Sequence, residues 1–171
     1  MWSDHWGGAV PDQLQLECYG AFGAGARLAR AGRLAIYPMH VSALAATMGS
    51  DRLPVDAVLI QLRPALNGRG WNLGVARDFV ARVARTARVV VAELNHHLPA
   101  CHGGDIDDLP ITALVEGHAS PVQVATPALS DTDRRVAAHV AALIPDGAVL
   151  QLGVGTIPAA LLAALSGHRD L

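Results

Sequence analysis

The chain has 171 residues and a formal net charge of -2 at pH 7, and 51% of its residues are hydrophobic. All 13 basic residues are arginine, so Schiff-base and Walker-type lysine chemistry is excluded within these residues. The slightly acidic balance lacks the basic footprint of a nucleic-acid-binding protein, and we expect no nucleic-acid partner.

The cysteines and the first residues bear on where the protein works. Cys18 and Cys101 are the only two cysteines, which is typical of reduced thiols rather than of a disulfide framework. Residues 1–6 have neither the basic nor the apolar run of a secretory signal. No uncharged apolar run reaches the length of a membrane span. We therefore expect a cytoplasmic protein with no membrane partner.

Short apolar segments bounded by helix breakers predict strands, most of them buried and parallel. These segments are residues 34–37, 56–62, 88–93, 113–116 and 148–152. Helical patterns lie between them. Val75, Phe79, Val80 and Val83 share one face of a first predicted helix. Strands that alternate with helices predict an α/β fold with three layers and a mostly parallel sheet.

Two further helices are predicted toward the end of the chain. Ser130 and Asp133 have the spacing of a capping box, and the helix that they begin ends before residues 145–147, Pro-Asp-Gly. Another helix follows Thr156. Their predicted inward-facing residues are Val136, Val140, Leu143 and Ile144 in the first helix, and Leu161, Leu162 and Leu165 in the second.

The strongest local signal is a glycine turn between the last predicted strand and the last predicted helix. Glycine permits positive φ and lets another molecule approach the backbone closely. The free N–H groups and the dipole at a helix start favour an anion, either a phosphate or a developing oxyanion. We expect the ligand-binding residues here, namely Gln151, Leu152, Gly153, Val154 and Gly155.

Two other interpretations of this turn stay open on the pattern alone. It could be a tight strand-to-helix turn with no ligand. The other interpretation is a dinucleotide-binding fold. Against it, Pro158 stands where the third glycine of the dinucleotide-binding motif belongs, and no residues remain for the ribose-binding acid about 20 positions on.

Four ordered motifs resemble the acetyl-CoA hydrolase/transferase family, which includes 4-hydroxybutyrate, butyrate and acetate CoA-transferases. They are residues 38–42 (PMHVS), residues 56–62 followed by 70–74 (DAVLIQL and GWNLG), residues 90–99 (VVAELNHHLP), and residues 144–171. The last resembles the signature I-x-DG-x-x-LQ-x-G-I-G-x-I-P-x-A. The resemblance covers residues 17–171, as the family's N-terminal domain, and leaves residues 1–16 unmatched.

The resemblance implies a fold of the CoA-transferase (NagB/RpiA-like) type and a ping-pong reaction between acyl-CoA and small carboxylates such as acetate. A glutamate attacks the thioester, passes through an anhydride and becomes a glutamyl-CoA thioester. In the family that glutamate lies in a Gly-x-His-Ser/Thr-Glu motif, which directly follows the Asp-Leu that matches Asp170 and Leu171. We therefore expect no catalytic residue in this chain, and an inactive chain on its own.

The resemblance also implies coenzyme A as a substrate and a partner that completes the site, either a C-terminal catalytic domain or further copies of the chain. Whether such an enzyme transfers or hydrolyses is left open. So are two alternatives to an enzyme segment, a non-catalytic module that binds coenzyme A or another anion, and an inactive gene remnant.

Four further single residues or groups of residues are candidates for a site. Glu93 ends a predicted strand, where open α/β sheets hold their sites, or it bonds loop amides. Asn95 either binds substrate or holds a loop in place, and the structural role is favoured. His40 and Ser42 form a catalytic pair or cap the following helix, and capping is favoured. The set His96, His97, Cys101 and His102 has no standard zinc spacing, and we expect no metal.

Overall fold

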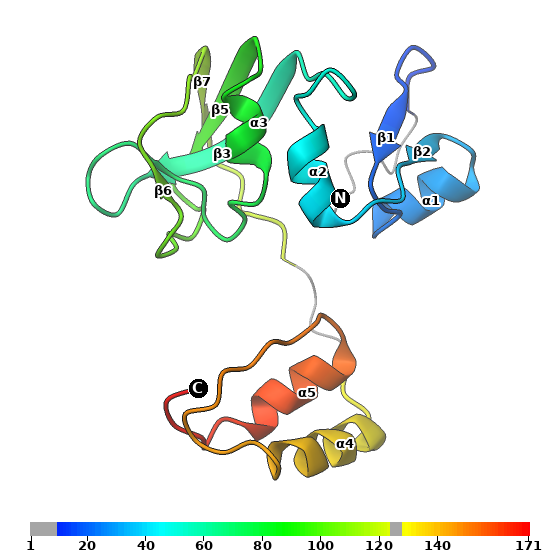
Figure 1. Cartoon of the computed structure of the whole chain (residues 1–171), viewed down its shortest axis with the longest axis vertical. Helices are drawn as coiled ribbons and strands as arrows, with labels where there is room; N and C mark the ends of the chain where they lie inside the picture. The colour runs from blue at the N-terminus through cyan, green and yellow to red at the C-terminus, as the bar shows by residue number, and fades with distance from the viewer. Residues whose placement is uncertain (1–9, 124–127) are drawn as a thin grey trace. The chain divides into compact units, whose positions relative to one another are not determined.

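The computed structural model describes residues 10–123 and 128–171 (Figure 1). The chain divides into two compact units, Met1–Val122 and Gln123–Leu171. No helix in the described ranges is long and apolar enough to cross a membrane.

Unit 1 begins with a small strand pair. β1 (Leu16–Cys18) and β2 (Leu34–Ile36) are parallel, and α1 (Ala24–Arg30) makes the crossover between them (Figure 1). Leu28 of α1 and Leu34 of β2 are buried between these elements, and α2 (Val41–Thr47) follows. The predicted strand at residues 34–37 is confirmed except for its last residue.

A five-stranded mixed sheet forms the centre of unit 1, in the order β6-β4-β3-β5-β7. β3, β5 and β7 are parallel, as their apolar runs predicted, while β4 and β6 add an antiparallel edge. The strands are β3 (Ala57–Pro64), β4 (Trp71–Asn72), β5 (Val89–Asn95), β6 (Asp105–Ile106) and β7 (Ala113–Gly117). The α/β fold class is confirmed, with a mixed sheet.

One face of this sheet carries the main core. Side chains alternate across a strand, so Val58 and Leu62 of β3 are buried under α3 (Val80–Ala84), whereas Leu59 is 79% exposed on the opposite face. The predicted helix over residues 75–83 is wrong at its start. Asp78 has φ 36, outside the helical region, so the helix begins only at Val80.

Unit 2 is a pair of packed helices, α4 (Asp131–Ala141) and α5 (Thr156–Ala164) (Figure 1). The predicted capping box is confirmed. Ser130 Oγ accepts from the Asp133 backbone N–H at 3.1 Å, and the Asp133 carboxylate accepts from the Ser130 N–H at 2.9 Å. The core of unit 2 consists of small and aliphatic residues, Ala137, Ala141, Ala160, Leu161 and Leu165.

The inward face predicted for α4 and its C-terminal flank is wrong in part. Val136 and Val140 are 37% and 36% exposed, and Leu143 is 83% exposed, while Ile144 is partly buried. Ala137 and Ala141 face α5 instead, because small side chains let the two helices approach closely. Leu162 of α5 was also predicted to face inward and is 60% exposed.

The predicted strand at residues 148–152 is not formed. Val149 is fully exposed, and only Leu150 and Leu152 pack against the helix pair. A strand is stabilised by hydrogen bonds to a neighbouring strand. The described residues of unit 2 contain no strand that could pair with this segment, so it remains extended and irregular.

Candidate functional site

The structure gathers the five predicted ligand-binding residues into one exposed turn that leads into α5. Gly155 is the N-cap residue, with φ 148 and ψ -177, a conformation available essentially to glycine alone. Val154 is 98% exposed, and a Cβ placed on Gly153 would meet no atom within 4 Å. The backbone of this turn is therefore open to an approaching molecule.

The backbone donors in the first turn of α5 have few partners in the part of the chain that the structure describes. The Ala159 N–H donates to the Gly155 carbonyl at 3.2 Å, and Pro158 has no N–H to offer. Among the described residues, no acceptor pairs with the N–H groups of residues 153–157. These donors point along the start of a helix, where the dipole adds a partial positive charge. The turn can accept an anion or a polarised carbonyl oxygen.

The residues before the glycines hold the turn in place. Leu150 and Leu152 pack against the core of unit 2, so the side chains between and after them face outward. Gln151 is exposed, and its Nε2 donates to the Leu152 carbonyl at 3.1 Å. Of the five predicted residues, Leu152 is thus an anchor, and the glycines and Val154 form the accessible surface.

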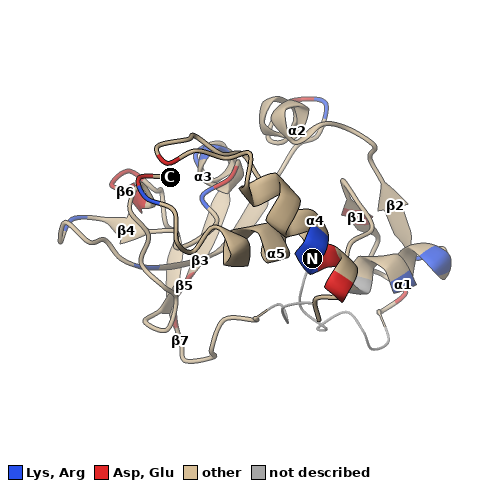
Figure 2. Cartoon of the chain, turned by 90° about the horizontal axis from the view of Figure 1, so that it is seen from below, with Lys and Arg blue, Asp and Glu red and all other residues tan. Residues whose placement is uncertain are grey.

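The backbone dipoles and a nearby carboxylate both contribute to the electric field at this turn. No residue of α5 is charged (Figure 2). Asp133 of α4 lies beside the first turn of α5, because Thr156 Oγ1 donates to its Oδ1 at 3.4 Å. Hydrogen bonds from the Ser130 hydroxyl and backbone N–H lower the pKa of Asp133, so this side chain is anionic at neutral pH. Sequence reasoning missed Asp133 as a neighbour of the turn.

Asn95 has a structural role. Its side chain is fully buried, its Nδ2 donates to the Ala119 carbonyl at 2.7 Å, and its Oδ1 accepts from the His97 N–H at 2.9 Å. These bonds tie the end of β5 to the loops that follow β5 and β7. The favoured interpretation of Asn95 is confirmed.

Glu93 lies on the open face of the sheet, two residues before Asn95. Its carboxylate rests against Gly117 of the adjacent strand, where a Cβ would overlap it, and Asn95 Nδ2 is 3.5 Å from its Oε1. Glu93 also lines a shallow depression of 490 Å³ together with Gln61 and Val115. Its position at the carboxyl end of parallel strands leaves both interpretations of Glu93 open.

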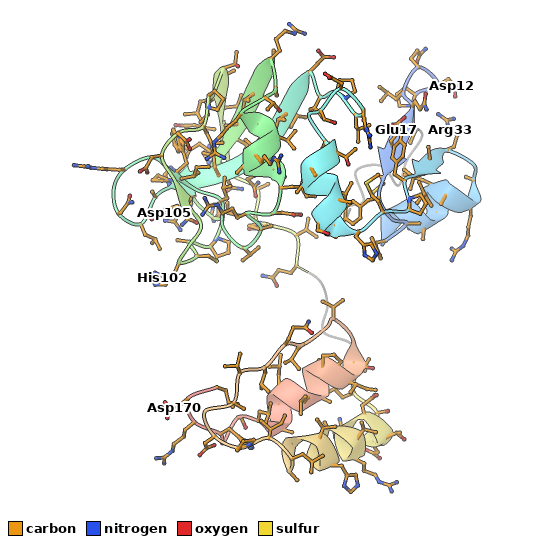
Figure 3. All side chains as sticks on the ribbon, viewed as in Figure 1. Asp12, Glu17, Arg33, His102, Asp105 and Asp170 are labelled. Atoms are coloured by element: carbon orange, nitrogen blue, oxygen red, sulfur yellow. The ribbon has the colours of Figure 1, made fainter. Side chains whose placement is uncertain are left out.

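The motif at residues 70–74 is explained by Asn72, which sequence reasoning did not single out. Asn72 is fully buried and makes four hydrogen bonds, the shortest from its Nδ2 to Asp105 Oδ1 at 2.6 Å. That bond is the main cause of the lowered pKa of Asp105. Figure 3 marks Asp105 on β6, next to the loop that carries His102. The network joins segments about 30 residues apart and is structural.

The structure does not bring the remaining predicted residues together in a site. His40 occupies the N-cap of α2, but its side chain makes no capping hydrogen bond. Among the described residues no group of three or more His, Cys, Asp or Glu side chains is arranged to hold a metal ion.

Comparison with known proteins shows which proteins this chain resembles. No family model matches the chain. The chain is 33% identical over 141 residues to the 4-hydroxybutyrate coenzyme A transferase of Clostridium kluyveri, covering 82% of this chain and 33% of that enzyme. It is 32% identical over 124 residues to the butyryl-CoA:acetate CoA-transferase of Anaerostipes caccae, covering 68% and 28%. The chain belongs to this family of CoA-transferases.

Similar solved structures agree with the assignment of this chain to the CoA-transferase family. The 4-hydroxybutyrate CoA-transferase of Porphyromonas gingivalis matches with a TM-score of 0.65 and 27% identity, over 90% of this chain and 41% of that one. RipA from Yersinia pestis matches with a TM-score of 0.72 and 25% identity, over 86% and 35%. The chain spans about a third of the length of the curated relatives that it matches.

Proposed function

We propose that this chain is the N-terminal, coenzyme A-binding part of an enzyme that transfers or hydrolyses short acyl groups. The substrates in this proposal are short-chain acyl-CoA and small carboxylates of the acetate type, and the enzyme works in the cytoplasm. The relatives support the substrate class, since they are a 4-hydroxybutyrate coenzyme A transferase and a butyryl-CoA:acetate CoA-transferase. The observation that carries the proposal is the exposed turn at residues 151–155, which leads into backbone donors that pair with no acceptor in the described part of the chain.

In this proposal the turn binds the thioester end of acyl-CoA. A glutamate carboxylate attacks the thioester carbonyl carbon, and the carbonyl oxygen becomes an oxyanion that accepts hydrogen bonds from the N–H groups at Gly155 and Thr156. The C–S bond then breaks, so that CoA leaves as a thiolate and an acyl-glutamyl anhydride remains. The thiolate attacks the glutamyl carbonyl, releases the carboxylate product and leaves a glutamyl-CoA thioester.

The attacking glutamate is proposed to come from outside these 171 residues. The chain contains Glu17, Glu93 and Glu116, and none of them lies in the family's Gly-x-His-Ser/Thr-Glu pattern. A C-terminal catalytic domain or further copies of the chain would complete the site. The chain itself contributes binding, orientation of the thioester and stabilisation of the oxyanion.

Two measurements on the purified chain test the proposal. Calorimetric titration with acetyl-CoA should show binding, and incubation of acetyl-CoA with labelled acetate should show no exchange of label. Exchange by the 171-residue chain would contradict the absence of the nucleophile. Failure of acetyl-CoA to bind at millimolar concentration would contradict the proposed role of the turn.

A further inference from the structure

Unit 1 contains a pocket that the proposed function does not use. A pocket of 340 Å³ lies between the β1–β2 strand pair, α2 and the start of α3. This volume is at the small end of the range for ligand sites, roughly 300–1,000 Å³. Its apolar wall includes Leu44 and Met48, and its polar wall includes Glu17 and Tyr37.

Aromatic side chains are concentrated in this pocket. The whole chain has seven of them, and three of the five that the structure describes line the pocket, namely Tyr19, Tyr37 and Phe79. Tyr19 also packs against Phe22, with ring centroids 6.1 Å apart and planes tilted by 56°. The faces of aromatic rings carry negative electrostatic potential and attract cations.

One carboxylate completes the polar wall. Glu17 of β1, labelled in Figure 3, accepts from the Tyr37 hydroxyl and, at 3.2 Å, from Gln15 Nε2. The bond to Glu17 is the main reason why the pKa of Tyr37 is raised, so the phenol stays protonated. None of the described residues lining the pocket is basic. Arg33 at the start of β2 is bound to Asp12 at 2.9 Å instead.

We propose that this pocket binds a small organic cation of the alkylammonium or quaternary ammonium class. The rings of Tyr19, Tyr37 and Phe79 contact the alkyl groups of the cation, and the Glu17 carboxylate balances its charge. Anionic molecules are disfavoured, because Glu17 has no cationic partner in the pocket wall. This inference is independent of the proposed function, since it uses none of residues 151–157.

Choline and its neutral carbon analogue 3,3-dimethylbutan-1-ol are suitable probes, because they have nearly the same shape and differ in charge. Met48 lines the pocket, whereas Met39 lies outside the lining. With 13C-methyl-labelled methionine, choline should shift the Met48 signal in a saturable manner and leave Met39 unchanged. Equal affinity for the neutral analogue, or no shift of Met48 with choline, would overturn the proposal.

Two matched variants separate the pocket carboxylate from a general charge effect. Glu17→Gln removes the charge from the pocket wall, and Glu116→Gln removes one from an exposed position on β7. We expect Glu17→Gln to weaken choline binding by roughly three- to fivefold, the range of a partly exposed ion pair, and Glu116→Gln to leave it unchanged. Equal effects of the two substitutions would also overturn the proposal.

Discussion

Thr156 Oγ1 donates a hydrogen bond of 3.4 Å to Asp133 Oδ1, which connects the first turn of α5 to the capping box of α4. The contact fixes how the two helices of unit 2 begin relative to each other. It also places a carboxylate beside the backbone donors of the glycine turn. A negative charge there occupies the positive end of the helix dipole and opposes the binding of another anion.

Replacing Asp133 with asparagine should therefore strengthen acetyl-CoA binding. Asparagine keeps an oxygen that can accept from Ser130, so the capping box of α4 survives, while the charge disappears. We expect affinity to rise by about two- to threefold at low salt, and the gain to shrink as salt is added. Calorimetric titration at two salt concentrations measures this.

Asp131→Asn is the matched control, because Asp131 lies in the same turn of α4 and pairs with Arg134 at 2.8 Å. It changes the net charge of unit 2 by the same amount. An equal rise in affinity for both variants would mean that overall charge, and not the contact with Thr156, controls binding.

The hydrogen bond from Asn72 to Asp105 predicts an acid-dependent loss of stability. The pKa of Asp105 is lowered in the folded chain, so this carboxylate stabilises the fold above its unfolded pKa of about 3.9 and the contribution is lost as pH falls through the folded pKa. Urea denaturation at a series of pH values should show the free energy of unfolding falling below about pH 4.

Asp105→Asn should remove part of that dependence, because the substituted residue no longer titrates. Asp51→Asn serves as the control, since Asp51 is exposed and accepts no hydrogen bond among the described residues. The same pH dependence in wild type and Asp105→Asn would contradict the assignment.

Gly117 allows the Glu93 carboxylate to lie against β7. A Cβ at position 117 would overlap that carboxylate, so the Glu93 side chain must turn aside, and we expect Gly117→Ala to lower the free energy of unfolding by about 1 kcal/mol. Glu93→Ala should recover most of the loss in the double variant, because the side chain that blocks the methyl group is gone. Urea denaturation of both single variants and the double variant measures the coupling, and strictly additive effects would refute it.

The sequence predicted the parts of the fold that depend on local pattern. β3 and β5 are continuous apolar runs, and α4 has a capping box, so both kinds of signal lie within a few adjacent residues. β4 and β6 have two residues each, too few to show any periodicity. β4 pairs with β3 and β6, and Asn72 bonds to Asp105 across 33 positions of the chain, which no local pattern reveals.

The candidate site, too, could be predicted only where it depends on neighbouring residues in the sequence. Residues 151–155 are contiguous, so the glycine turn could be predicted together with the helix after it. The strand expected before the turn did not form, since pairing needs a neighbour that local sequence does not specify. Asp133 reaches the turn only through packing of α4 against α5, 23 positions away, and was therefore missed.

The central claim is that acetyl-CoA approaches the bare backbone of the glycine turn, and Gly153→Ala tests it most directly. A methyl group at Gly153 or at Gly167 meets no atom within 4 Å, and neither glycine has a positive φ, so both alanine variants should fold like the wild type. If the turn binds the thioester, the methyl group of Gly153→Ala should keep the thioester away from the N–H groups at Gly155 and Thr156. We expect binding of acetyl-CoA to weaken at least about fivefold, equivalent to about one hydrogen bond, while Gly167→Ala should not change it. Equal binding by wild type and both variants, with unchanged melting temperatures, would contradict the claim.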